Sequence, residues 1–407
     1  MNMQQASTPA RPGLFDPAVR ADPYPLYAAL RETSPVLPLM PGTWAFLRHA
    51  DCAEILRDGD FGKDFEGRIS PRRADAAPLT SVAVQGLSRS MLTRDPPDHT
   101  RLRGLVVRAF TARRIDELRP RIARIVDDLL DAVEPQGEMD LIGAFAHRLP
   151  VIVICDMLGV PEADRGRFLG DYRVGGRLLD PVPLTPQELA RADDAALEMR
   201  AYWESLFDRR AADPGDDLVS ALMAVEDAHD GRLTRDELAS NINLLFAAGH
   251  ETTTNLIGNG MIAFARFPDQ WRRLVADPSL AANAAEEMLR FDSPVQLTGR
   301  KVFRDCEIGG HALKRGEHVT CVIGAANRDP ALYENPEAVD ITRKGIKLLS
   351  FGGGIHFCLG AQLARTEAEL AFRRLAERLP VITIDPDAID WRDSITLRGA
   401  KRIPATW

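Results

Sequence analysis

The sequence predicts a mainly α-helical protein with a minor β part, folded as one large domain. Apolar residues recur at helical spacing from about residue 99 to 300, and a further helical pattern covers about 358–380. Short runs suited to strands occur at about 34–48, at 300–325 and near the C-terminus. We find no internal repeat and no linker between two cores in the 407 residues. We therefore expect a helix-rich lobe and a small β-rich lobe within a single domain.

The N-terminal quarter is expected to be irregular. Residues 1–23 are polar and rich in proline, which predicts a loose arm, and 24–32 has helical spacing. Two short apolar runs flank Pro41–Gly42 and predict a hairpin. Residues 58–98 show little periodicity and many Gly, Pro and Arg, so we expect a long loop. A loop of this length inside a domain suggests a binding role.

The longest helix is predicted in TRDELASNINLLFAAGHETTTNLIGNGMIAFARF. Thr234 and Glu237 form a capping-box pair at its start, and Pro268 ends it. At 1.5 Å per residue such a helix is about 50 Å long, enough to cross a domain.

Composition excludes several classes of protein. The formal net charge of −8 gives no support for nucleic-acid binding. The five cysteines are scattered and odd in number, which favours a reducing compartment over a disulfide framework. The longest apolar run, at 149–155, is too short for a membrane span, and the N-terminus shows no signal peptide. A monomeric cytoplasmic enzyme is the expectation.

The stretch FGGGIHFCLG places Cys358 in a glycine-rich loop directly before a helix-like run. A helix N-terminus offers free N–H groups and a positive dipole that stabilise a thiolate. Glycines let a flat, bulky partner approach the backbone closely. A lone thiolate suits haem, which brings its own equatorial ligands. The alternative on these residues alone is a structural cysteine beside a glycine turn.

The same loop resembles the signature of the cytochrome P-450 superfamily, the haem-thiolate monooxygenases. AGHETT at 248–253, EEMLR at 286–290 and DPPDHTRLR at 95–103 also resemble bacterial members. The resemblance implies a triangular prism with haem b between the long central helix and the helix after the cysteine loop. It implies that Cys358 binds the iron. The loop residues that match the signature are Phe351, Gly352, Gly354, His356, Cys358 and Gly360.

The resemblance also implies roles for residues elsewhere in the chain. Ala248 and Gly249 would contact the cofactor, and Glu251 with Thr252 would deliver protons to bound oxygen. Buried pairing of Glu287, Arg290 and Arg343 would be structural. Taken singly, such residues are more often surface charges or ordinary helix side chains. The haem propionates would be held by His99, Arg103, Arg300 and His356.

The substrate pocket implied by the resemblance is aliphatic, which favours lipophilic ligands. We expect hydroxylation or epoxidation of a terpenoid, steroid or macrolide-like molecule of secondary metabolism. A fatty acid held by Arg89 or Arg94 is the alternative. The expected lining residues are Val82, Val84, Leu87, Leu92, Leu245, Ala248, Val295, Leu297, Ile395 and Leu397.

The expected reaction uses dioxygen and two electrons from an external ferredoxin and its reductase. A non-oxygenase haem-thiolate protein that binds a gas or another ligand is the alternative; a peroxygenase is disfavoured because Glu251 and Thr252 are present. An arginine-rich segment at 101–124 is the expected docking face for an acidic ferredoxin. Its arginines are Arg101, Arg103, Arg108, Arg113, Arg114, Arg119, Arg121 and Arg124.

Overall fold

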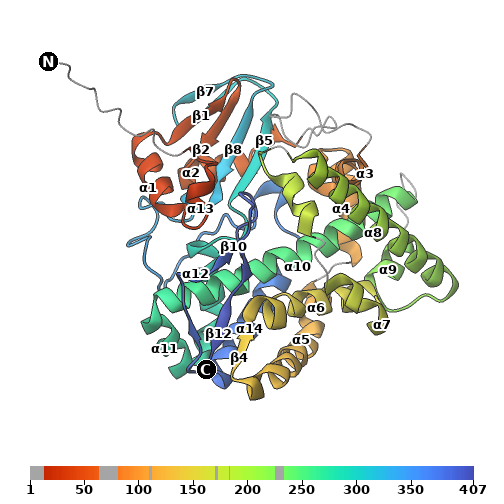
Figure 1. The fold of residues 1–407 in the computed structure, drawn as a ribbon. Helices are drawn as coiled ribbons and strands as arrows, with labels where there is room; N and C mark the ends of the chain where they lie inside the picture. The colour runs from red at the N-terminus through yellow and green to blue at the C-terminus, as the bar shows by residue number, and fades with distance from the viewer. Residues whose placement is uncertain (1–12, 64–80, 110–111, 170–172, 183, 225–232) are drawn as a thin grey trace.

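Helices make up the larger part of the protein, and a five-stranded sheet lies to one side of them (Figure 1). The computed structural model describes residues 13–63, 81–109, 112–169, 173–182, 184–224 and 233–407. The predicted mainly α fold with a minor β part is confirmed. The main helices are α1 (Tyr24–Thr33), α2 (His49–Arg57), α3 (Val82–Ser88), α4 (Asp98–Ala109), α5 (Ala112–Val133), α6 (Arg148–Leu158), α7 (Glu162–Arg165), α8 (Pro186–Ala212), α9 (Leu218–Ala224), α10 (Arg235–Arg266), α11 (Pro268–Ala276), α12 (Ala281–Phe291), α13 (Ile323–Ala326) and α14 (Ala361–Arg378).

The five-stranded sheet has the order β1-β2-β8-β5-β3. The hairpin predicted around Pro41–Gly42 is its first antiparallel pair, and the neighbouring pair β2–β8 is parallel. Its strands are β1 (Val36–Met40), β2 (Thr43–Phe46), β8 (His318–Val322), β5 (Leu297–Val302) and β3 (Phe61–Gly62). The shorter strands are β4 (Glu138–Asp140), β12 (Pro404–Thr406) and β9 (Thr383–Ile384) in one sheet, β6 (Cys306–Ile308) with β7 (His311–Leu313), and β10 (Asp390–Trp391) with β11 (Ala400–Arg402).

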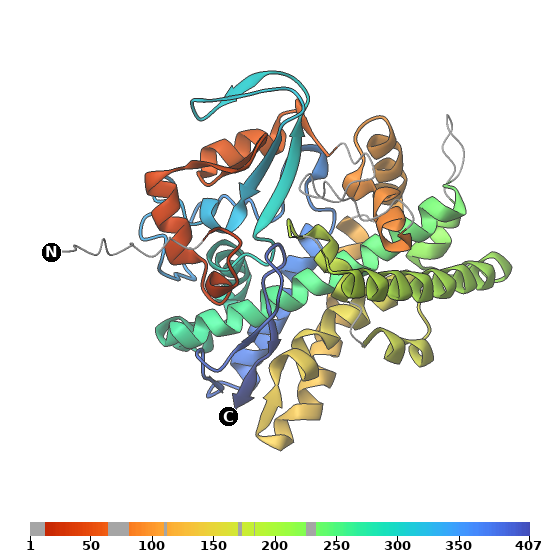
Figure 2. The same ribbon diagram turned by 45° about the horizontal axis from the view of Figure 1, so that its top comes forward.

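Helix α10 crosses the middle of the molecule, between the large sheet and helices α5 and α6 (Figures 1 and 2). The predicted capping box is present, because the Thr234 hydroxyl accepts from the Glu237 N–H at 3.2 Å and the Glu237 carboxylate accepts from the Thr234 N–H. Nearly all side chains from residue 253 to 264 of α10 are buried. The helix therefore has packed neighbours on every side there and forms the centre of the core.

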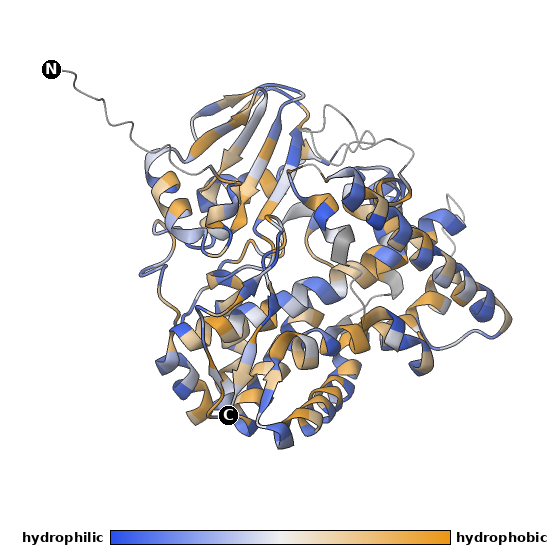
Figure 3. Cartoon of the chain, viewed as in Figure 1, coloured by the Kyte–Doolittle hydropathy of each residue, from blue (hydrophilic) through white to orange (hydrophobic). Residues whose placement is uncertain are grey.

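The largest hydrophobic core joins α5, α6, α10, α12 and α14. Apolar and polar residues alternate along α5 (Figure 3), whose buried residues include Ile122, Val126 and Leu130. Helix α14, which follows the cysteine loop, packs against α10, α12 and α5. The start of α14 is thus held against the rigid centre of the molecule.

Part of the predicted long loop is ordered into short elements. Instead of a loop, residues 81–93 form α3 and a 3-10 turn at Met91–Thr93. The Ser81 hydroxyl caps α3 by accepting from the Val84 N–H at 3.3 Å, and Asp193 of α8 accepts from both the Ser81 hydroxyl and the Ala83 N–H. Because this contact joins residues far apart in the sequence, the local pattern could not predict α3.

The predicted N-terminal arm is partly ordered too. Leu14 is buried beside Tyr24 and Tyr27, and Pro17–Val19 forms one turn of 3-10 helix. Residues 1–12 of that arm and 64–80 of the predicted loop lie outside the described residues. In the part of the chain that the structure describes, no helix combines the length and apolar character needed to cross a bilayer.

Candidate active site

The cysteine loop is folded back on itself by its own backbone. The Cys358 N–H donates to the Phe351 carbonyl at 2.8 Å, and Gly352 and Gly354 have positive φ angles of 70° and 61°. A Cβ on Gly354 would lie 2.7 Å from the Leu56 carbonyl oxygen of α2. Glycine is therefore required at this close approach.

The Cys358 side chain faces a cavity of about 1110 Å³, although protein surrounds it on most sides. Burial raises the pKa of the Cys358 thiol, while a hydrogen bond from the Gly360 backbone and the charges of Arg103 and Arg365 act in the opposite direction. The start of α14 thus supplies the N–H donor expected at a helix N-terminus. Within the described residues, no three His, Cys, Asp or Glu side chains gather as a metal site.

The middle of α10 lines the same cavity. Ala248, Gly249, Glu251 and Thr252 all border it. The Thr252 hydroxyl donates to the Ala248 carbonyl at 2.8 Å, one turn back. Helix α10 is continuous from Arg235 to Arg266, so Thr252 and its acceptor Ala248 lie within one helix.

Glu251 is buried and ion-paired. Its carboxylate lies 3.1 Å from the guanidinium of Arg392, which in turn donates to the Ala400 carbonyl of β11. On another side, a Cβ on Gly176 would lie 2.7 Å from the same carboxylate. Arg392 was not singled out from the sequence, because nothing local links it to a residue 141 positions earlier.

Two histidines from distant segments meet at one end of the cavity. The rings of His99 on α4 and His356 in the loop have centroids 4.4 Å apart, and both side chains are buried. Among the described residues, the Nε2 atom of each ring has no hydrogen-bond partner, and Asp95 is 3.9 Å from that of His356. Burial lowers the pKa of His356 to about 4 and also lowers that of His99. Burial thus favours the neutral form of both rings, and the nearby Asp95 carboxylate opposes it only in part.

Two arginines complete this group of donors. Arg300 on β5 is only 4% exposed and donates to the Gly299 carbonyl and the Thr298 hydroxyl at 2.9 and 3.2 Å. Arg103 on α4 donates to the Phe357 carbonyl at 2.7 Å. In the described residues neither arginine has a carboxylate partner, whereas most other arginines of the protein do.

Behind the loop, Glu287 and Arg290 form a fully buried ion pair at 2.8 Å, and Arg343 lies 3.2 Å from Glu287. Arg290 also donates to the Asn327 carbonyl at 3.3 Å. The Asn327 amide accepts from the Leu349 N–H at 3.0 Å, just before the loop begins. The three predicted residues are thus linked, through Asn327, to the segment that enters the cysteine loop.

Most predicted substrate contacts border the cavity, but two do not. Val84 packs with Ala83, Leu178 and Ala192, because α3 turns it away from its neighbour Val82. Ile395 is buried in the cluster that contains Leu14 and Leu297. The remaining predicted contacts line the cavity: Val82, Leu87, Leu92, Leu245, Ala248, Val295, Leu297 and Leu397.

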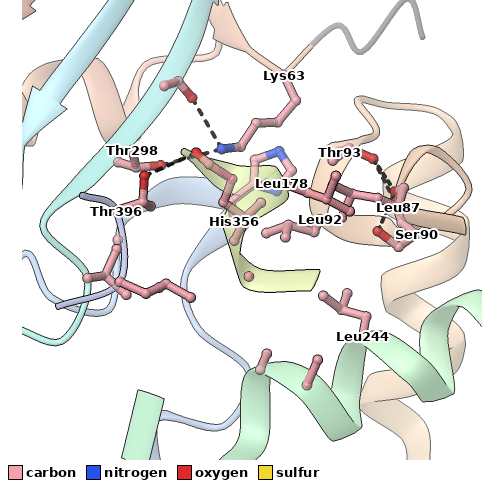
Figure 4. Close-up of a pocket in the computed structure, with 18 of the residues that line it drawn as sticks. Lys63, Leu87, Ser90, Leu92, Thr93, Leu178, Leu244, Thr298, His356 and Thr396 are labelled. Carbon is pink, nitrogen blue, oxygen red and sulfur yellow. Dashed lines mark hydrogen bonds between the residues drawn. The ribbon is translucent and has the colours of Figure 1, made fainter. Parts of the chain in front are cut away.

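Further residues that were not predicted also line the cavity (Figure 4). Leu178 and Leu244 add apolar surface, and Thr396 and Lys63 add polar atoms. Of the two arginines considered as fatty-acid anchors, Arg89 lines the cavity but lies 3.6 Å from Asp236. Arg94 lies 3.7 Å from Asp98, so each already has an acidic partner.

The arginine-rich segment is less positive than its sequence suggests. Arg101, Arg114, Arg119 and Arg121 each contact a carboxylate, on Glu237, Asp216, Glu369 and Asp156 respectively. The side chains of Arg108 and Arg113 lie outside the described part of the chain.

The family description "Cytochrome P450" matches residues 192–391. The chain is 39% identical to the cytochrome P450 monooxygenase PikC of Streptomyces venezuelae, over 100% of this chain and 97% of that protein. It is 41% identical to the vitamin D(3) 25-hydroxylase of Pseudonocardia autotrophica, over 97% and 96% of the two chains. A crystal structure of a myxobacterial cytochrome P450 in complex with myristic acid superposes with a TM-score of 0.87, at 40% identity and covering 98% and 99% of the chains.

Proposed function

Because this chain belongs to the cytochrome P450 family and is a P450 monooxygenase of the bacterial hydroxylase type, we propose that it inserts one oxygen atom from dioxygen into a lipophilic small molecule. One observation carries the proposal: Cys358, Glu251 and Thr252 border a single cavity whose wall is otherwise largely aliphatic. The cysteine would bind the iron and the acid–alcohol pair would deliver protons. Because they border the same cavity, both can act in one reaction.

The residues at this cavity fit haem b. Cys358 offers a single sulfur ligand. Two imidazole nitrogens and two arginines, none of which has an acidic partner within hydrogen-bond distance in the described residues, offer donors for two propionates. We assign Cys358 to the iron, and His99, Arg103, Arg300 and His356 to the propionates. Phe351, Gly352 and Gly360 of the loop, with Ala248 and Gly249 of α10, would contact the ring. Bound haem with a thiolate ligand supplies oxygen activation, because thiolate electron density favours O–O cleavage.

We propose that Glu251 and Thr252 deliver protons at the cavity. The Thr252 hydroxyl, anchored to Ala248, presents its oxygen as a hydrogen-bond acceptor and proton carrier. Glu251 takes protons from the protein interior and passes them toward Thr252. Arg392 holds the Glu251 carboxylate in place, and positioning of this kind decides whether protons arrive at the productive oxygen.

The substrate we propose is a medium-sized lipophilic molecule, such as a terpenoid, steroid or macrolide-like product of secondary metabolism. Its support is the aliphatic wall formed by residues such as Leu245, Val295 and Leu397, together with the similarity to a vitamin D(3) hydroxylase. A fatty acid is the second candidate, because a relative of similar fold was crystallised with myristic acid. Arg89 and Arg94 were expected to bind the fatty-acid carboxylate, but the acids beside them make them weaker candidates for this role.

A two-step experiment tests the reaction and the substrate class. Purified protein is first titrated with a steroid, a macrolide and myristic acid, and binding is read from the haem absorption spectrum. Ligands that bind are then incubated with an electron-donor system under ¹⁸O₂. One ¹⁸O atom per product molecule is expected. Turnover without ¹⁸O in any product would instead favour a non-oxygenase haem-thiolate protein.

We further propose that electrons come from an external ferredoxin and its reductase. The candidate docking face lies beside the cysteine loop, where Ile355 and Phe357 are about half exposed and Arg103 contacts the loop. Exposed apolar side chains suit the centre of such a docking face, and the arginine-rich segment at 101–124 would supply basic residues toward a small acidic electron carrier.

A further inference from the structure

A lysine that the sequence did not mark lies at the donor-rich end of the cavity. Lys63 follows β3, which pairs with β5 so that Gly62 lies opposite Lys301. Its backbone N–H donates to both carboxylate oxygens of Asp95 at 2.9 Å, which fixes the residue where it leaves the sheet. The side chain points into the cavity beside His356 (Figure 4).

Within the described residues, the hydrogen-bond acceptors of the Lys63 ammonium are neutral. It donates to the Gly299 carbonyl at 3.2 Å and to the Thr298 hydroxyl at 3.4 Å. These are the same two acceptors that Arg300 uses, at 2.9 and 3.2 Å. Two cations therefore converge on one carbonyl and one hydroxyl, and across the described residues neither forms an ion pair with a carboxylate.

The local charge balance calls for an anion. Burial lowers the pKa of Lys63 well below its usual value, and the nearby charge of Arg300 acts in the same direction. The Asp95 carboxylate, which accepts from the Lys63 backbone, raises the pKa of Lys63 and so offsets the effect of burial only in part. Asp95 is thus shared between a part-buried lysine and the buried Arg300, and a second carboxylate between the two cations would accept charge-assisted hydrogen bonds from both.

We propose that Lys63 is a further carboxylate-binding residue, acting with Arg300 and His356 at this end of the cavity. The inference rests on the haem function proposed above and adds a residue outside the predicted propionate set. The carboxylate is either a haem propionate or the acid group of a bound substrate. Arg89 and Arg94 each lie near an acid, whereas the Lys63 side chain lines the cavity and has no acidic partner among the described residues.

The test compares Lys63→Gln, Lys63→Arg and the exposed-site control Lys344→Gln as purified holoenzymes. Each variant is first checked for a thiolate-type spectrum of its reduced carbon monoxide complex. Haem loss to excess apomyoglobin is then timed, and binding of myristic acid and of its neutral methyl ester is titrated. These readouts do not depend on turnover.

If the partner is a propionate, Lys63→Gln loses haem about tenfold faster than the control, and Lys63→Arg stays close to wild type. If the partner is a substrate acid, haem loss is unchanged, but Lys63→Gln weakens myristic acid about tenfold without affecting the ester. Haem loss and myristic acid binding that both match the Lys344→Gln control would overturn the proposal. Equal defects in Lys63→Gln and Lys63→Arg would also overturn it. A normal carbon monoxide spectrum in that case leaves the proposed monooxygenase function intact.

Discussion

Glu251 shows how a single side chain depends on parts of the chain far from it. Its neighbour Thr252 is one residue away, but Arg392 comes from the C-terminal strands, and Gly176 approaches from the segment before α8. The acid–alcohol pair could be predicted from its local motif. Its ion-pair partner could not, because that contact exists only after the C-terminal strands fold against α10.

Removing either member of the pair should separate electron flow from product formation. Thr252→Ala should retain haem and substrate binding but release reducing equivalents as peroxide, because proton delivery is misdirected. Glu251→Gln should slow turnover roughly a hundredfold, the usual scale for loss of a positioned proton donor. Product and peroxide formed per NADPH oxidised give the readout.

Thr252→Ser, which keeps the hydroxyl, is the matched control and should stay coupled. Wild-type coupling in both Thr252→Ala and Glu251→Gln would rule out the proposed relay.

At the scale of elements, helix ends were more predictable than irregular segments. The start of α10 followed from Thr234 and Glu237 because a capping box is a contact within four residues. The order in residues 81–93 was missed because α3 depends on Asp193 of α8 and on burial of Val84. The same packing explains why Val84 was wrongly expected at the cavity.

The link from α12 to the cysteine loop gives an element-scale prediction. Glu287→Ala leaves Arg290 buried without its main partner, and loss of one member of a buried pair costs about 3–5 kcal/mol. Glu286→Ala, next in sequence, removes only the partly exposed contact with Arg365 and should cost at most about 1 kcal/mol. Urea unfolding followed by haem absorbance measures both. Similar losses in the two variants would show that the buried pair does not hold the loop.

At the scale of the whole molecule, the cavity collects residues from nearly every part of the chain. Lys63, Leu178, Leu245, Arg300 and Thr396 line one space although they lie on separate elements. The cysteine loop could be recognised because its signature is contiguous. Lys63 carries no local signal, since its position follows from the pairing of β3 with β5.

Electron transfer from a partner gives a prediction for the arginine-rich segment at 101–124, the expected docking face. Reduction of the protein by a plant-type ferredoxin and its reductase should slow as salt is added, because charge steering is screened. Arg114→Glu should slow it further at low salt, although Asp216 already offsets part of that charge. Arg304→Glu, an exposed charge reversal on the β-rich side, is the control. Rates indifferent to salt and to Arg114→Glu would exclude docking at this face.

The central claim is that one thiolate, that of Cys358, holds the haem. The most direct measurement is the absorption spectrum of the reduced carbon monoxide complex in wild type, Cys358→Ser and the control Cys306→Ser. Wild type and Cys306→Ser should give the thiolate-type band, and Cys358→Ser should lose it, because a neutral hydroxyl cannot supply the same electron density. A thiolate-type band that persists in Cys358→Ser, or that disappears in Cys306→Ser, would contradict the account.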